Sequence, residues 1–165
     1  MRLTELVGYL DAFLRVQEVP DYPNAHNGLQ VAGSREIRRV ALTVDACLAT
    51  IRGAVECDAD LLIVHHGLFW EDTVPLTGRF YARVQPLFAS GMALYSCHLP
   101  LDVHPEVGNN ATLCRLLALT PCETFARFEG IETGLIATAR TTREALRAEL
   151  DELLGTSTRV IACGP

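Results

Sequence analysis

An adjacent pair of histidines is the feature of the sequence with the clearest capacity for chemistry. His65 and His66 follow a continuous apolar run at 61–64, which is typical of a strand buried on both faces. Neighbouring side chains on a regular strand point to opposite faces, but Gly67 allows the backbone to turn, so both rings can reach a common site. Two adjacent imidazoles suit two metal ions better than one. The alternative is that one ring caps the strand end and the other is exposed.

A second group of polar residues follows the apolar run at 92–95. His98 comes directly after this run, and Asp102 lies four residues later. Imidazole and carboxylate groups together suit zinc, manganese, iron or nickel. Asp102 is predicted to bind a metal directly, whereas His98 is a ligand, a support for a ligand or a general acid. His104 is either a site residue or a packing residue of its own Pro-flanked loop.

Alternating strands and helices are the elements that must position these residues. Helices are expected at 4–16, 47–57, 80–90, 109–118 and 142–154, a loop at 20–34, and strands at 40–44, 61–64, 92–95, 131–138 and 158–163. The pattern predicts an α/β layered fold with a largely parallel or mixed sheet flanked by helices. Ligands of open α/β sheets bind beyond the carboxyl ends of the strands, so the polar residues should meet at one rim. Asp45, which ends the first strand, is there either a partner for an imidazole or a helix cap.

Composition limits the class of protein. The chain has 165 residues, a net charge of −6 and 49% apolar residues, and its arginines form no basic patch, which argues against nucleic-acid binding. There is no 18-residue apolar run and no signal peptide, so we expect a cytoplasmic protein with no membrane contact. The six cysteines contain no Cys-x-x-Cys pair and are expected to be buried free thiols. Residues 1–122 are predicted to form a first α/β lobe with the metal-ligand motifs, and 123–165 to begin a second or inserted segment.

Three sequence blocks together resemble a known family. They are the Asn-Gly-Leu-Gln block at 27–33, the His-His-Gly block at 63–70 and the His-Leu-Pro-Leu-Asp block at 98–110. Their order and spacing are similar to those of the GTP cyclohydrolase I type 2-like family, also called Nif-three-like dinuclear metal-binding proteins. The resemblance covers essentially the whole chain and is densest over 20–115.

The resemblance implies a fold, an assembly and a metal site. Members are cytoplasmic, build two related α/β lobes and assemble as toroidal hexamers with two divalent metals per chain. The family pattern makes His65, His66 and Asp102 metal ligands and puts His98 beside the metals. Members supply two more ligands from a late His-x-x-x-Glu segment, whereas the last histidine here is His104. The chain is therefore expected to be an N-terminal portion with an incomplete second lobe, or else a short paralogue.

Three functions remain open at the level of sequence. The first is a metal-dependent hydrolase that acts on a nucleotide-like substrate through metal-activated water, with His98 as proton shuttle. The second is a non-catalytic metal-binding or regulatory adaptor protein. The third is a short form that has lost its activity and binds metal weakly or as a single ion, because three protein ligands are too few for two four-coordinate sites.

Overall fold

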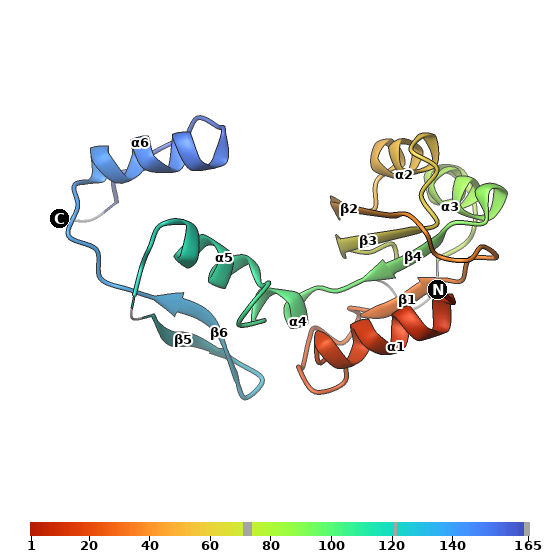
Figure 1. Ribbon diagram of the computed structural model, residues 1–165, viewed down its shortest axis with the longest axis horizontal. Helices are drawn as coiled ribbons and strands as arrows, with labels where there is room; N and C mark the ends of the chain where they lie inside the picture. Colours follow the sequence, from red (N-terminus) through yellow and green to blue (C-terminus); the bar gives the residue numbers. More distant parts are fainter. Residues whose placement is uncertain (71–73, 121, 164–165) are drawn as a thin grey trace. The chain divides into compact units, whose positions relative to one another are not determined.

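The chain folds into two compact units. The computed structural model describes residues 1–70, 74–120 and 122–163. The first unit is Met1–Asp102 and the second is Val103–Pro165. The α/β class expected from the sequence is confirmed, since the first unit holds a four-stranded sheet flanked by helices (Figure 1).

The sheet of the first unit is mixed, with three parallel strands and one antiparallel strand. Its order is β1-β4-β3-β2, and the strands are β1 (Gly28–Val31), β2 (Val40–Asp45), β3 (Leu61–His66) and β4 (Ala93–Ser96). Strands β2, β3 and β4 are parallel, while β1 pairs antiparallel with β4. The expected strands at 40–44, 61–64 and 92–95 are confirmed. The expected loop at 20–34 is corrected, because β1 lies within it.

Helices cover the two faces of this sheet. They are α1 (Leu3–Phe13), α2 (Leu48–Glu56), α3 (Gly78–Ser90) and the short α4 (Leu99–Asp102). Apolar side chains of α1 pack against one face, and α2 and α3 pack against the other (Figure 1). The helix α4 follows β4 directly, so it extends from the carboxyl edge of the sheet.

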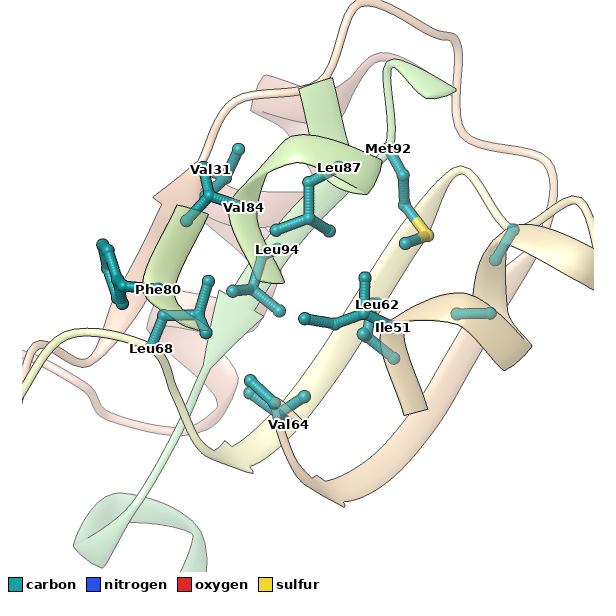
Figure 2. Packing of buried hydrophobic residues seen from close by; sticks show 13 residues of the cluster. Val31, Ile51, Leu62, Val64, Leu68, Phe80, Val84, Leu87, Met92 and Leu94 are labelled. Atoms are coloured by element: carbon teal, nitrogen blue, oxygen red, sulfur yellow. The ribbon is translucent and has the colours of Figure 1, made fainter. Parts of the chain in front are cut away.

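Strand β3 is central because it contributes to the cores on both faces. Leu62 and Val64 join the cluster under α2 and α3 (Figure 2). Leu61 joins the cluster under α1. Each of these side chains is at most 1% exposed. This burial on both faces explains the continuous apolar run in the sequence. It also positions the last two residues of the strand, the histidine pair, at the carboxyl edge of the sheet.

Strand β2 differs, because one of its faces carries an exposed apolar row. Val40, Leu42 and Val44 alternate along the strand and are 41%, 77% and 59% exposed. Ala41, which points the other way, packs against the α2–α3 side of the core. In the sheet order β2 is an edge strand.

The second unit contains a hairpin between two helices of the sequence. Its elements are α5 (Asn109–Leu116), β5 (Glu123–Phe128), β6 (Ile131–Ile136) and α6 (Arg143–Leu154). Strands β5 and β6 pair antiparallel across Glu129 and Gly130, whose φ angles of 45° and 92° suit a tight two-residue hairpin turn. Asn110 Nδ2 donates to the Thr133 carbonyl at 2.8 Å and ties α5 to β6.

Two expectations for the second unit need correction. Strand β5 was not expected, and the strand expected at 158–163 is wrong, because these residues, all of them described, have no regular secondary structure. The predicted lobe boundary between residues 122 and 123 stays a prediction. In the part of the chain that the structure describes, no helix combines the length and apolar character needed to span a bilayer.

Candidate metal centre

Three imidazole rings gather at the carboxyl edge of the sheet. His65 and His66 end β3, and His98 follows the neighbouring parallel strand β4. One ring nitrogen of each residue lies within 4.8 Å of one ring nitrogen of the other two. The expectation that the strand ends bring polar residues to one rim therefore holds for these three. We call them the His cluster.

The two adjacent histidines share one site because the chain turns directly after them. The centroids of the His65 and His66 rings are 4.6 Å apart, although the residues are neighbours on a strand. Gly67 is buried there, and a Cβ at this position would lie 2.3 Å from the Gln30 Nε2 atom. A side chain at position 67 would therefore require the Gln30 amide to move.

Hydrogen bonds hold both rings of this pair through Nδ1. His65 Nδ1 lies 3.0 Å from the Cys97 carbonyl oxygen, and His66 Nδ1 lies 2.7 Å from Asp45 Oδ1. A carboxylate accepts hydrogen bonds, so Nδ1 carries the proton in a neutral His66 ring and its Nε2 keeps the lone pair. In contrast, both ring nitrogens of His65 face acceptors, the Cys97 carbonyl oxygen and Asp102 Oδ2. The two interpretations of Asp45 are thereby resolved in favour of an imidazole partner.

His98 is held by a buried network that the sequence did not reveal. Its Nδ1 lies 2.9 Å from Asp21 Oδ1, and its backbone N–H donates to Asn27 Oδ1 at 2.7 Å. The Asp21 and His98 side chains are only 5% and 14% exposed. Burial opposes ionisation of Asp21, but hydrogen bonds from Asn27 and His98 outweigh it and hold the pKa of Asp21 below its usual value.

Asp102 brings a carboxylate to the same cluster from α4. Its Oδ2 lies 3.4 Å from His65 Nε2, and its side chain is 24% exposed. This carboxylate raises the pKa of the His65 imidazole, with the Cys97 carbonyl contributing and burial opposing. The negative charge of Asp102 favours a positive charge at this position, whether a proton on His65 Nε2 or a metal cation bound by both side chains. The pair is therefore suited to hold a positive charge.

The Asn-Gly-Leu-Gln motif supports the cluster without joining it. Asn27 binds the His98 backbone and also donates to Asp21 Oδ2 at 2.8 Å. Gln30 Oε1 accepts from the Leu68 N–H at 2.7 Å, and so braces the segment after the histidine pair. Both amides thus act on the loops that carry the cluster.

His104 is not a member of the His cluster, and Asp21, which supports the cluster, was not predicted from the sequence. His104 belongs to the second unit and is buried, and its Nδ1 accepts from the backbone N–H groups of Glu106 and Val107, each at 3.2 Å. These bonds favour the loop-packing interpretation. Asp21 was missed because it lies 77 residues before His98 in a loop with no local signal for a site.

The donor set fits a divalent metal ion. Imidazole and carboxylate groups are ligands that zinc, manganese and iron accept. Supporting acceptors at the far nitrogen of metal-binding imidazoles are typical of such sites. The His cluster can therefore hold a metal ion, while the assignment of His65, His66 and Asp102 as ligands stays a prediction.

Comparison with known proteins identifies the family of the chain. A family model described as Duf34/NIF3 (NGG1p interacting factor 3) matches residues 1–164. The chain is 48% identical over 136 residues to a GTP cyclohydrolase 1 type 2 homolog of Pyrococcus abyssi. These residues make up 82% of the chain and 54% of that relative. A homolog of the same name from Archaeoglobus fulgidus is 41% identical over 155 residues, which cover 94% of the chain and 62% of that relative.

A solved structure shows the same fold. The protein TTHA1606 from Thermus thermophilus superposes with a TM-score of 0.85 at 42% identity, over 95% of this chain and 63% of that one. The chain spans about half the length of the curated relatives it matches. On the strength of the family model, these relatives and this fold, the chain belongs to the Duf34/NIF3 family.

Proposed function

We propose that the His cluster binds divalent metal and that the protein hydrolyses a nucleotide-like substrate with metal-activated water. His65, His66 and Asp102 are the proposed ligands. The observation that carries the proposal is that one ring nitrogen of each imidazole lies within 4.8 Å of one ring nitrogen of the other two, while an oxygen atom holds every ring at Nδ1. A bound divalent ion supplies Lewis acidity that brings the pKa of water near 7.

His98 is the proposed proton shuttle of this reaction. Its Nε2 is available, and Asp21 at 2.9 Å from Nδ1 stabilises the imidazolium that forms when Nε2 takes up a proton. A ring held in this way accepts a proton from water and returns it to a leaving group without moving. Proton transfer by this route requires an imidazole with Nδ1 toward a carboxylate and Nε2 toward the reacting atoms.

The nucleotide-like character of the substrate rests on the relatives' name and on two aromatic residues. The curated relatives are named GTP cyclohydrolase 1 type 2 homologs. The rings of Trp70 and Tyr22 lie 4.9 Å and 6.1 Å from the His98 ring, centroid to centroid, and Tyr22 is 53% exposed. Aromatic side chains beside a site offer stacking surfaces for a planar base. We also propose a cytoplasmic homo-oligomer, a hexamer by family resemblance.

Metal analysis tests the ligand assignment. The chain is stripped with a chelator, reloaded separately with Zn²⁺, Mn²⁺ or Fe²⁺ and measured for bound metal by mass spectrometry. The double variant His65→Ala, Asp102→Ala is expected to lose the metal. His26→Ala, an exposed histidine outside the His cluster, is the matched control and is expected to retain it. Unchanged metal content in the double variant would contradict the assignment.

Turnover separates the enzyme from a non-catalytic metal-binding protein. The second function is favoured by the donor count, because the His cluster and Asp102 offer at most four protein ligands, which are too few for two four-coordinate sites. Nucleoside triphosphates and phosphoesters are assayed with each reloaded metal. Activity that follows metal content and disappears in His66→Ala supports the hydrolase. One tightly bound ion without turnover supports the adaptor function.

A further inference from the structure

We infer that Asp21 is a positioning residue that fixes the tautomer of His98, with the proton on Nδ1 and the Nε2 lone pair free for the site. The inference rests on the proposed function in one respect only, which is that the Nε2 lone pair is used in the metal site. The tautomer itself is a property of the metal-free protein, and it is measured there.

The carboxylate of Asp21 has all its acceptor positions occupied by donors. Oδ1 accepts from the Tyr22 N–H at 2.7 Å and faces His98 Nδ1 at 2.9 Å. Oδ2 accepts from Asn27 Nδ2 at 2.8 Å and from the Leu99 N–H at 2.9 Å, with His98 Nδ1 at 3.2 Å. Two carboxylate oxygens offer about four lone-pair sites. The group is therefore locked in rotation, and its face toward His98 accepts hydrogen bonds only.

The ring of His98 is consequently fixed in place and in proton position. Asn27 holds the backbone N–H of His98 through Oδ1, and the same Asn27 side chain holds Asp21 through Nδ2. The imidazole is 14% exposed, so bulk water does not compete strongly for Nδ1. A neutral ring that places its proton on Nε2 would turn a bare lone pair toward a carboxylate. That arrangement loses a charge-assisted hydrogen bond and gains repulsion.

The other two rings of the His cluster are held differently. His65 faces a backbone carbonyl, which no side-chain substitution removes. His66 faces Asp45, but these two side chains are 45% and 63% exposed, so water can replace the carboxylate. Of the two carboxylates that face a ring Nδ1 in the cluster, Asp21 is thus the buried one. Asp45 provides the matched exposed control.

The variant Asp21→Asn reverses the hydrogen-bond polarity at constant size. If the amide oxygen keeps the donors Asn27 Nδ2 and Leu99 N–H, the amide nitrogen takes the place of Oδ1, where it faces His98 Nδ1 and donates to it, and the hydrogen bond from the Tyr22 N–H is lost. Nδ1 must then carry the lone pair, and the proton moves to Nε2. A residue that merely ties the loop to the sheet edge would lower stability without this exchange.

The test is the ¹⁵N spectrum of the imidazoles in metal-free protein, recorded above the pH at which the rings are charged. His98→Gln identifies the His98 signals. The wild-type ring is expected as the Nδ1–H tautomer, Asp21→Asn as the Nε2–H tautomer, and Asp45→Asn is expected to leave His98 unchanged. Circular dichroism checks that each variant is folded.

Two results would overturn the inference. One is a wild-type His98 ring with its proton on Nε2, which needs no variant to fold. The other is a folded Asp21→Asn protein with the wild-type tautomer. Titration with Zn²⁺ adds a separate readout, where loss of the supporting carboxylate is expected to weaken binding by about 10–100-fold. If wild type binds no metal while the tautomers behave as expected, the proposed function fails and the positioning role stands.

Discussion

At the scale of single residues, the sequence identified the chemistry but not the partners that make it work. His65, His66 and His98 follow buried strands, so their meeting at one rim follows from the topology of a parallel sheet. Asp21 lies in an irregular loop and meets His98 only after the chain has folded. Residue types with regular spacing were predictable, whereas a hydrogen bond across 77 residues was not.

Asp60 gives a residue-scale prediction about pH. It is 4% exposed, accepts from the Arg38 and Arg39 N–H groups at 2.8 and 2.9 Å, and pairs with Arg35 at 2.9 Å. Burial opposes its ionisation, but these backbone bonds outweigh burial and lower its pKa. A lowered pKa means that the stabilisation is present above the unfolded value, near 4, and is lost as pH falls through the folded pKa.

Asp60→Asn is therefore expected to cost about 1–3 kcal/mol of unfolding free energy at pH 7. The difference from wild type should shrink as the pH falls toward and below the folded pKa of Asp60. Urea unfolding at several pH values measures it. Asp58→Asn, an exposed partner of the same Arg35, is the control and should cost less than about 0.5 kcal/mol. A cost that does not change with pH would contradict the role of the charge.

At the scale of elements, prediction succeeded where burial imposes a pattern. Strands β2, β3 and β4 were expected because they are apolar runs, two of them well covered. Strand β1 has four residues in a loop rich in Gly and Asn, and β5 is almost fully exposed, so neither shows a clear apolar period. The run at 158–163 has strand propensity, but strands are stabilised by packing against neighbours rather than by propensity.

A glycine inside a helix and a glycine in the segment after β1 are expected to respond in opposite ways to alanine. Gly53 lies inside α2 with nothing near the position of a new Cβ, so Gly53→Ala should stabilise by about 0.5–1 kcal/mol. At Gly33 a Cβ would lie 2.7 Å from the Gly91 carbonyl oxygen and 2.8 Å from the Ala93 nitrogen. Both are backbone atoms, so Gly33→Ala should destabilise by about 1–3 kcal/mol. Chemical unfolding of both variants measures the contrast, and equal effects would contradict it.

At the scale of the whole molecule, the candidate site lies inside one compact unit. The His cluster, Asp102 and Asp21 all belong to the first unit. Its sheet and its two cores hold the elements that position them. The stability of this unit and the occupancy of the site are therefore thermodynamically linked.

Metal is expected to raise the unfolding midpoint of the first unit. A site filled at 100 times its dissociation constant adds about 2.7 kcal/mol. Thermal unfolding with and without Zn²⁺ should show an upward shift for wild type and for His26→Ala. His66→Ala should show little or none, because it removes one of the three imidazoles. A shift of equal size in His66→Ala would place the metal elsewhere.

The exposed apolar row of β2 affects how molecules of this protein meet one another. An edge strand with outward apolar side chains is a template for pairing with another chain, and Leu42 is the most exposed residue of the row. Arg38 and Arg39 precede the strand and Asp45 ends it, so charged residues flank the apolar row at both ends and oppose its pairing with another chain. The net charge of −6 adds a general repulsion that salt screens within about 10 Å at 0.1 M. Colloidal stability therefore depends on ionic strength, and dilute buffer favours it.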